Sequence, residues 1–162
     1  MKLKKHLDFR KAYVAVYIVA VIIYFAIGLS PADAAEYAIH GHLSIPSIQL
    51  ETDVTELELE NRKLNAPENI AGSFKFTLGD TLIIGHASSV FYDLVEVRPG
   101  DVIVYNDATY TVKELEIVKK ENVDMGEVLS LSPQETIKLM TCYGELYDNG
   151  DASERIIITA SK

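Results

Sequence analysis

The stretch KLMTCYGELYDNGDASERIIITASK, residues 138–162, predicts two β-strands joined by a polar loop. Its apolar residues gather in two runs, one ending at Cys142 and the other beginning at Arg155. The loop between the runs contains Gly144 and Gly150, which permit bends, so we expect it to form a flexible rim. If the two strands are neighbours, Cys142 and Arg155 can face one another across them.

Other strand-like segments precede this stretch. HLSIPSIQLETDV, residues 42–54, alternates apolar and polar residues, and Pro46 is typical of a strand start or a sheet edge. DTLIIGHASS, residues 80–89, is a brief apolar run that ends in a turn of small residues. DVIVYNDATYTVKELEIV, residues 101–118, indicates two strands joined through an Asn-Asp turn.

Few segments favour a helix. Residues 90–97 are compatible with one or two helical turns, residues 55–72 with a helix or a loop, and residues 121–132 with a loop. Short strands at close spacing, with few helical segments between them, predict an all-β barrel or sandwich.

The N-terminus indicates export. A basic segment, residues 1–11, precedes eighteen uncharged residues, 12–29, which as a helix would measure about 27 Å and nearly cross a bilayer. We expect an uncleaved signal anchor with a cytoplasmic N-terminus, a linker at residues 30–41 and an extracellular domain at residues 42–162. A cleaved signal peptide is the alternative, because residues 32–34, Ala-Asp-Ala, resemble a cleavage site.

The charge of the exported part argues against a nucleic-acid partner. Beyond residue 11 the chain has ten Lys and Arg against 23 Asp and Glu, a net charge of −13. Such a domain lacks the basic footprint of a nucleic-acid-binding protein. The acidity is explained by a soluble surface, and calcium binding is not supported because no EF-hand-type loop occurs. We therefore expect no nucleic-acid partner and no cofactor.

Three residues form a candidate Cys-His site. Cys142 is the only cysteine, so no intramolecular disulfide can form, and the thiol is either buried filler or a reactive group. His86 follows an apolar run in a turn small enough to leave its ring accessible, and Arg155 could supply an oxyanion donor. Taken singly, His86 is better explained as a structural turn residue, and Arg155 as the partner of a surface salt bridge. His40 and His42 are expected in the linker, as solvated residues.

Four motifs resemble the sortase family and together cover residues 43–161. LSIPSIQLETDV resembles the opening strand of sortases, and DTLIIGHASSVFYDLVEVRPGDVIVY resembles the segment around their catalytic histidine. IKLMTCY resembles the strand that carries the nucleophile, and ERIIITA resembles the last strand with its arginine. The resemblance implies a closed, mostly antiparallel barrel of about eight strands with one or two short helices.

The resemblance also implies cysteine transpeptidation of a sorting signal carried by exported proteins. Cys142 would be the nucleophile, His86 the general acid and base, and Arg155 the residue that holds substrate and stabilises the oxyanion. Thr141 is expected either to bond near the substrate or to be an ordinary strand residue. The acceptor would be an amine, from a cell-wall precursor or a pilin lysine, and the sortase class is left open.

Three other classes compete with this interpretation. Papain-like hydrolases place Cys before His, the reverse of the order here, and L,D-transpeptidases expect an S-H-G-C motif that this chain lacks. The non-enzymatic alternative is a membrane-tethered binding domain with a non-catalytic Cys142.

Overall fold

The computed structural model describes residues 37–60, 63–76, 80–130, 132–148 and 151–162. The expected basic tail, the anchor and the possible cleavage site lie outside the described residues. Within the described part of the chain, no helix is long and apolar enough to cross a membrane.

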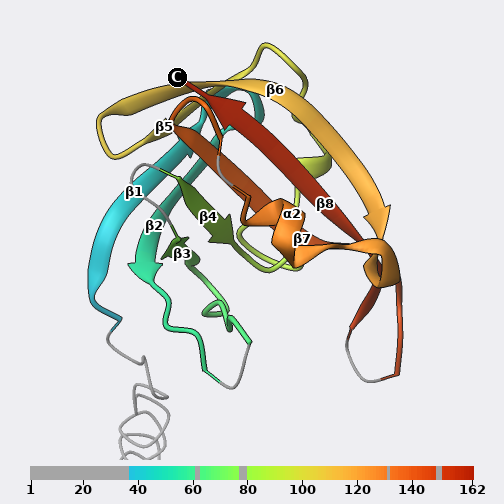
Figure 1. Ribbon diagram of the computed structural model, residues 1–162. Coiled ribbons are helices and arrows are strands. Elements are labelled where there is room, and N and C mark those ends of the chain that lie inside the picture. The colour runs from blue at the N-terminus through green and yellow to red at the C-terminus, as the bar shows by residue number, and fades with distance from the viewer. Residues whose placement is uncertain (1–36, 61–62, 77–79, 131, 149–150) are drawn as a thin grey trace, which may run out of the picture. The chain divides into compact units, whose positions relative to one another are not determined.

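Eight strands close into a barrel in the order β1-β2-β3-β4-β7-β8-β6-β5, with β5 returning to β1 (Figure 1). Among the strand pairs in the described part of the chain, only β2–β3 and β4–β7 are parallel, and the other pairs are antiparallel. The expected closed barrel of about eight strands is therefore confirmed. The strands are β1 (Ile39–Ile45), β2 (Leu50–Glu56), β3 (Ala71–Lys75), β4 (Thr81–Ile84), β5 (Val102–Tyr105), β6 (Ala108–Lys119), β7 (Thr136–Leu146) and β8 (Ala152–Ser161).

The helical pieces are short: η1 (Pro46–Ile48), η2 (Leu94–Glu96), η3 (Lys120–Asn122) and α2 (Met125–Val128). The helical turn expected in residues 90–97 is present as η2. The loop expected at residues 121–132 instead contains part of η3 and all of α2. Asp124 caps α2 by accepting a hydrogen bond from the backbone N–H of Gly126, a stabilising contact that the sequence prediction overlooked.

Alternation along the strands sends apolar side chains to both faces of β4, β7 and β8. The inner face carries Leu139 and Ile158, which are fully buried in the barrel core. The outer face carries Ile84 and Ile157, and it is covered by residues that follow β2 and by the segment between β6 and β7. This second cluster, called the outer cluster below, consists of Leu57, Leu82, Ile84, Val128 and Ile157.

The first strand begins earlier than expected. His40 and His42 were expected to be solvated linker residues, although the predicted strand-like segment itself began at His42. Both lie in β1, where His42 pairs with Asp53 of β2. The His42 ring also reaches Glu51, with Nε2 2.6 Å from Oε2. Backbone pairing with β2 makes this segment a strand, which its polar composition did not predict.

The two strands of the C-terminal hairpin run further than expected. Residues 143–146 continue β7 and residues 152–154 begin β8, so most of the predicted flexible rim is strand. The register shifts between Tyr143 and Leu146, around Gly144, whose φ of 83° suits a residue without a Cβ. Gly150 lies outside the described residues.

Candidate active site

Antiparallel pairing of β7 with β8 places Cys142 directly opposite Arg155. By alternation both residues belong to the outer face, since each lies two residues along its strand from an outer-face residue, Met140 on β7 and Ile157 on β8. Cys142 is a free thiol and is half-buried, so it is not part of the barrel core. The prediction that these two residues face one another is confirmed.

Parallel pairing of β4 with β7 brings the turn that carries His86 to the side of β7 away from β8. Ile84 is in register with Met140, and the backbone N–H of Gly85 donates to the Met140 carbonyl oxygen. Gly85 also accepts a hydrogen bond from Thr141, so His86, the next residue, lies in a turn held against the part of β7 that carries Cys142. The nucleophile candidate lies on the middle strand, with the arginine on β8 and the histidine in the turn that follows β4.

A buried carboxylate anchors the start of this parallel pair. Asp80, immediately before β4, accepts hydrogen bonds from the backbone N–H groups of Ser132 (3.1 Å) and Thr136 (2.9 Å). The Asp80 side chain is almost fully buried, at 5% exposure, so these bonds satisfy it away from water. They tie the beginning of β7 to the beginning of β4, upstream of Cys142 and His86.

The histidine ring is exposed and bonded to a loop. His86 Nε2 lies 3.0 Å from the carbonyl oxygen of Ala66, in the segment between β2 and β3. Because a carbonyl oxygen can only accept, Nε2 carries the proton in this arrangement. In the neutral ring Nδ1 is then the nitrogen able to accept a proton.

The arginine is held along its own hairpin. Its Nη1 donates to the carbonyl oxygens of Ala152 (3.0 Å) and Glu154 (2.8 Å), and its Nη2 donates to Asp151 Oδ1 (2.6 Å). Asp151 also accepts from Lys120 of η3. The pKa of Asp151 is lowered from its ordinary value, first by Lys120 and then by Arg155. Sequence reasoning missed Asp151 and Lys120, because nothing distinguished this acid from the other acidic residues of the loop.

Thr141 lies on the opposite face of β7 from Cys142. It is 3% exposed, and its Oγ1 donates to the carbonyl oxygen of Gly85 at 2.8 Å. This bond joins the strand that bears the thiol to the turn that bears the histidine. The contact favours a role in holding the site together over direct contact with substrate.

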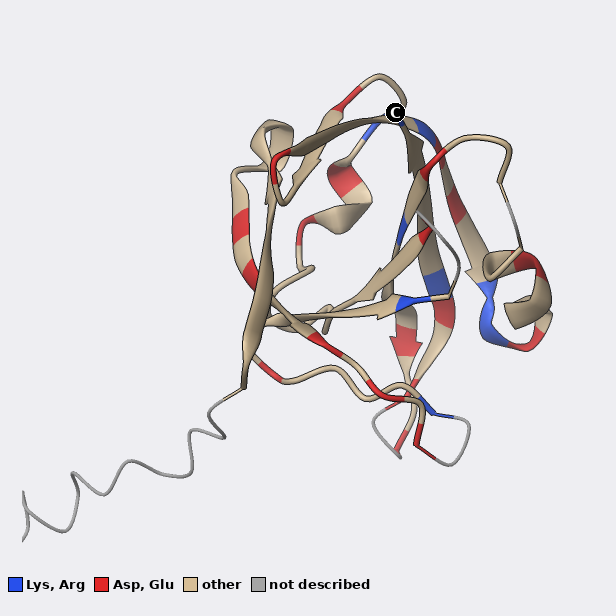
Figure 2. Cartoon of the chain, turned by 60° about the vertical axis from the view of Figure 1, so that its left-hand side comes forward, with Lys and Arg blue, Asp and Glu red and all other residues tan. Residues whose placement is uncertain are grey.

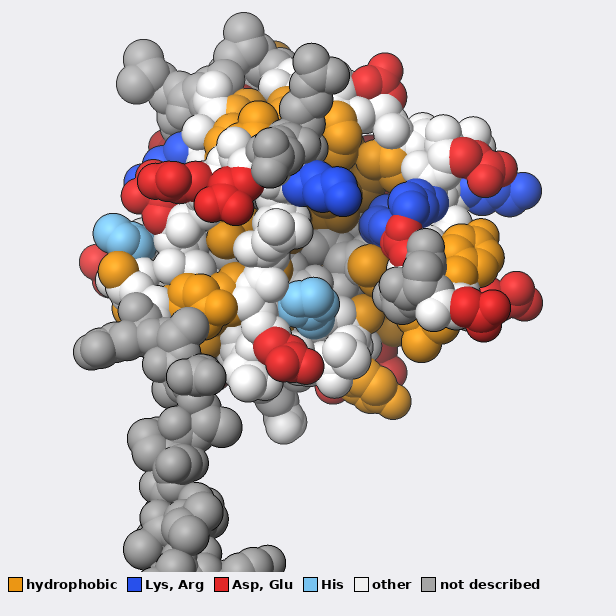
Figure 3. All heavy atoms as spheres, turned by 90° about the horizontal axis from the view of Figure 1, so that it is seen from below, with side chains coloured by type: hydrophobic (Ala, Val, Ile, Leu, Met, Phe, Trp, Pro, Cys, Tyr) orange, Lys and Arg blue, Asp and Glu red, His pale blue; other side chains and the backbone are white. Residues whose placement is uncertain are grey.

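The surroundings are mixed in character. The space-filling view of Figure 3 shows one face on which a histidine and basic side chains occur together with acidic and apolar ones. Acidic residues are otherwise spread over the barrel (Figure 2). Among the residues that the structure describes, no group of three or more His, Cys, Asp or Glu side chains could hold a metal ion.

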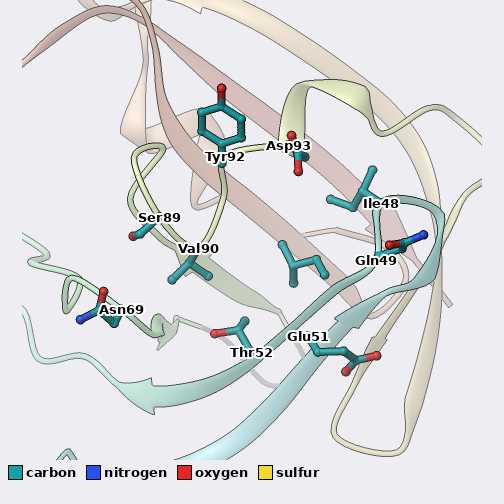
Figure 4. Close-up of a pocket in the computed structure, with 10 residues that line it drawn as sticks. Ile48, Gln49, Glu51, Thr52, Asn69, Ser89, Val90, Tyr92 and Asp93 are labelled. Carbon is teal, nitrogen blue, oxygen red and sulfur yellow. The ribbon is translucent and has the colours of Figure 1, made fainter.

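A pocket of about 470 Å³ borders the turn that follows His86 (Figure 4). It lies between residues 48–52, at the start of β2, and residues 89–93, and none of the three candidate site residues lines it. The lining residues are Ile48, Gln49, Leu50, Glu51, Thr52, Asn69, Ser89, Val90, Tyr92 and Asp93.

Known proteins share this fold. A sortase A from Listeria monocytogenes superposes with a TM-score of 0.58 at 20% identity, over 76% of this chain and 86% of that chain. A sortase from Actinomyces oris gives 0.57 at 19% identity, over 78% and 82%. A sortase transpeptidase from Clostridium perfringens gives 0.58 at 21% identity, over 78% and 82%. No curated protein matches the chain.

The family is shown by the sequence itself. A family model described as a sortase domain matches residues 43–162, which is most of the chain. That match spans the histidine, the cysteine and the arginine whose strands the barrel brings together. The chain therefore belongs to the sortase family.

Proposed function

We propose that this chain is a cysteine transpeptidase that cleaves a sorting signal and transfers the acyl fragment to an amine. The observation that carries the proposal is the position of Cys142 on β7, directly opposite Arg155 and next to the turn that carries His86. A half-buried thiol with a guanidinium on one adjacent strand and a histidine in the turn after the other has the parts that thioester chemistry requires.

In the first half-reaction the Cys142 thiolate attacks the carbonyl carbon of the scissile peptide bond. A carbon–sulfur bond forms, and the negative charge that moves to the carbonyl oxygen is stabilised by Arg155. The carbon–nitrogen bond then breaks, and the departing amine takes a proton from His86. The products are a thioester on Cys142 and a free C-terminal fragment of the substrate.

In the second half-reaction an amine attacks the thioester carbonyl. The incoming amine gives its proton to His86, and the carbon–sulfur bond breaks as a new amide forms. The cycle returns Cys142 as a thiolate and His86 in its protonated form. The acceptor amine is proposed to belong to a cell-wall precursor or a pilin lysine, and the substrate to an exported protein.

The N-terminal segment supports an extracellular site for this reaction. Residues 12–29 are long and apolar enough to serve as a signal anchor, and residues 1–11 carry the basic charge expected on the cytoplasmic side. The proposed enzyme is thus a single-pass membrane protein with its catalytic domain outside the cell.

Three substitutions test the assignment of roles. Cys142→Ala is expected to abolish transfer of a sorting peptide to an amine, and His86→Ala and Arg155→Ala each to lower the rate by orders of magnitude, since the groups act as a unit. Product is measured by mass spectrometry of the ligated peptide.

Matched controls come from the described residues of the same domain. His40 is exposed on β1, and Arg98 bonds to nearby carbonyl oxygens in the turn before β5. His40→Ala and Arg98→Ala should retain the wild-type rate. Turnover by the Cys142→Ala chain would refute the proposed mechanism.

A further inference from the structure

Arg155 belongs to a small ionic cluster with Asp151 and Lys120. The cluster joins the β7–β8 loop to the segment between β6 and β7. Asp151, at the end of the β7–β8 loop, uses Oδ1 for Arg155 and Oδ2 for Lys120. Lys120 belongs to η3, at the start of the segment between β6 and β7. The pairing of β6 with β8 places Val118 opposite Arg155, and Lys120 follows Val118 by two residues along the chain.

The cluster is partly shielded from water. The side chains of Arg155 and Asp151 are 15% and 24% exposed, whereas Lys120 is 48% exposed. Asp151 Oδ1 additionally accepts the backbone N–H of Ala152 at 2.9 Å. A carboxylate fixed by two cations and a backbone donor is a rigid point to which a guanidinium can be attached.

The bonds of Arg155 use part of its donor capacity. A guanidinium carries five N–H groups. Two on Nη1 donate to carbonyl oxygens of its own strand region and one on Nη2 donates to Asp151. Among the described residues, this leaves one N–H on Nη2 and one on Nε for a substrate oxygen.

We propose that Asp151 is a positioning residue for Arg155, and that Lys120 strengthens its hold by fixing the carboxylate. This inference rests on the proposed function, because it assigns Arg155 a carbonyl oxygen to contact. An oxyanion donor works only within about 2.7–3.1 Å of the oxygen, and a displacement of about 1 Å can cost about 100-fold in rate. Asp151 therefore acts through Arg155, and the charge of Lys120 connects the β6–β7 segment to the same guanidinium.

The opposite interpretation is that Asp151 sequesters Arg155 and inhibits the enzyme. The two interpretations differ in the sign of one effect. Under positioning, Asp151→Asn slows formation of the acyl-enzyme, whereas under sequestration the same substitution accelerates it.

The test uses the full 162-residue chain in detergent and a pool of sorting-signal peptides. The rate of the mass increase on Cys142 is measured in a single turnover. We expect Asp151→Asn to lower this rate about 10- to 100-fold. Lys120→Gln should lower it less, because Arg155 keeps its carboxylate, and Asp151→Glu should restore part of the loss. Asp148→Asn is the matched control, since Asp148 is an exposed acid of the same loop.

Two further readouts separate positioning from a merely structural role. In the Arg155→Gln background, Asp151→Asn should cause no additional loss, because a residue that acts through Arg155 has nothing left to position. Alkylation of Cys142 by iodoacetamide, which needs no oxyanion donor, should proceed at the wild-type rate in Asp151→Asn.

The outcomes distinguish this inference from the proposed function. If the wild-type chain forms the adduct but Asp151→Asn forms it at the same rate or faster, the positioning role alone is overturned. The same follows if the rate losses of Asp151→Asn and Arg155→Gln multiply in the double variant. No wild-type adduct with any peptide would overturn both. A double-mutant cycle in chemical unfolding would still measure whether Asp151 and Arg155 are coupled in the folded chain.

Discussion

At the scale of single residues, Thr141 shows how a side chain outside the chemistry can set the geometry of the site. Its hydroxyl points into the barrel and donates to the Gly85 carbonyl, while Cys142 takes the opposite face of the same strand. Gly85 also lies against Phe91, so closely that a Cβ at position 85 would lie 2.8 Å from the ring. Gly85, the residue before His86, is thus held by two contacts, one with Thr141 and one with Phe91.

Replacing Thr141 by Val should show what its hydrogen bond contributes to stability, apart from the volume of the side chain. The substitution keeps the shape of the side chain but leaves the buried Gly85 carbonyl oxygen without its donor, a loss of about 1–3 kcal/mol in the free energy of unfolding. Urea unfolding measures this loss, and Thr141→Ser, which keeps a hydroxyl, is the control. Equal stability of the Val variant and the wild type would show that the bond contributes nothing.

His42 provides a prediction about pH. Hydrogen bonds to Glu51, and then to Asp53, raise the pKa of His42 above its ordinary value of 6.5. We expect its imidazole to titrate above 6.5 in an NMR experiment. The midpoint should fall in Glu51→Gln, and by less in Asp53→Asn.

The sign of the stability effect follows from the raised pKa. The ion pairs of protonated His42 stabilise the folded chain fully below pH 6.5, and this contribution disappears as the pH rises through the folded-state pKa. The effect is small because the side chain is about half exposed. A stability difference between the wild type and Glu51→Gln that grows with rising pH would contradict this account.

At the scale of elements, the β7–β8 hairpin separates what the sequence could predict from what it could not. The apolar runs around Cys142 and Arg155 were sufficient to predict two strands and their facing residues. The extension of β7 to Leu146 was missed because its residues are exposed and lack alternation. That extension depends on a bulge at Gly144 and on a bond from the Glu145 N–H to Ser153 Oγ.

The segment between β6 and β7 was missed for a similar reason. Its short helix α2 depends on Lys138 of β7, whose buried Nζ donates to the carbonyl oxygens of Glu127 (3.1 Å) and Val128 (2.7 Å). Such a contact between a strand lysine and a distant helix end has no local sequence pattern. It also places Val128 in the outer cluster, beside the strands that carry the site.

Lys138→Met should therefore loosen this segment. The substitution removes charge-assisted hydrogen bonds worth about 1.5–3 kcal/mol while preserving much of the buried volume. We expect faster amide hydrogen exchange in residues 125–130, with strand amides of the barrel unchanged. Lys113→Met, at an exposed position of β6, is the control. Unchanged exchange in α2 would show that other contacts hold the segment.

At the scale of the whole molecule, barrel closure creates the site. Local patterns predicted most strands, but they could not show that β4 pairs in parallel with β7, which is what brings the turn that carries His86 next to the strand that carries Cys142. The residues joined there are more than fifty positions apart, and Asp80 fixes their register through backbone bonds near the start of β7. The resemblance to sortases, rather than periodicity, predicted that His86 and Cys142 act in one site, and the parallel pairing itself was not predicted.

The barrel also accounts for the order of the site residues along the chain. His86 follows β4, Cys142 is in β7 and Arg155 is in β8, and these three strands are consecutive in the closed sheet. We expect this arrangement to make Cys142 a nucleophile that carries an acyl group between two amines.

The most direct test is intact-mass spectrometry of the full chain incubated with pooled sorting-signal peptides, with and without an oligoglycine amine. The account predicts an acyl adduct that maps to Cys142 and is discharged by the amine as a ligated peptide appears. A chain that forms no adduct, and whose thiol is alkylated only after denaturation, would contradict it.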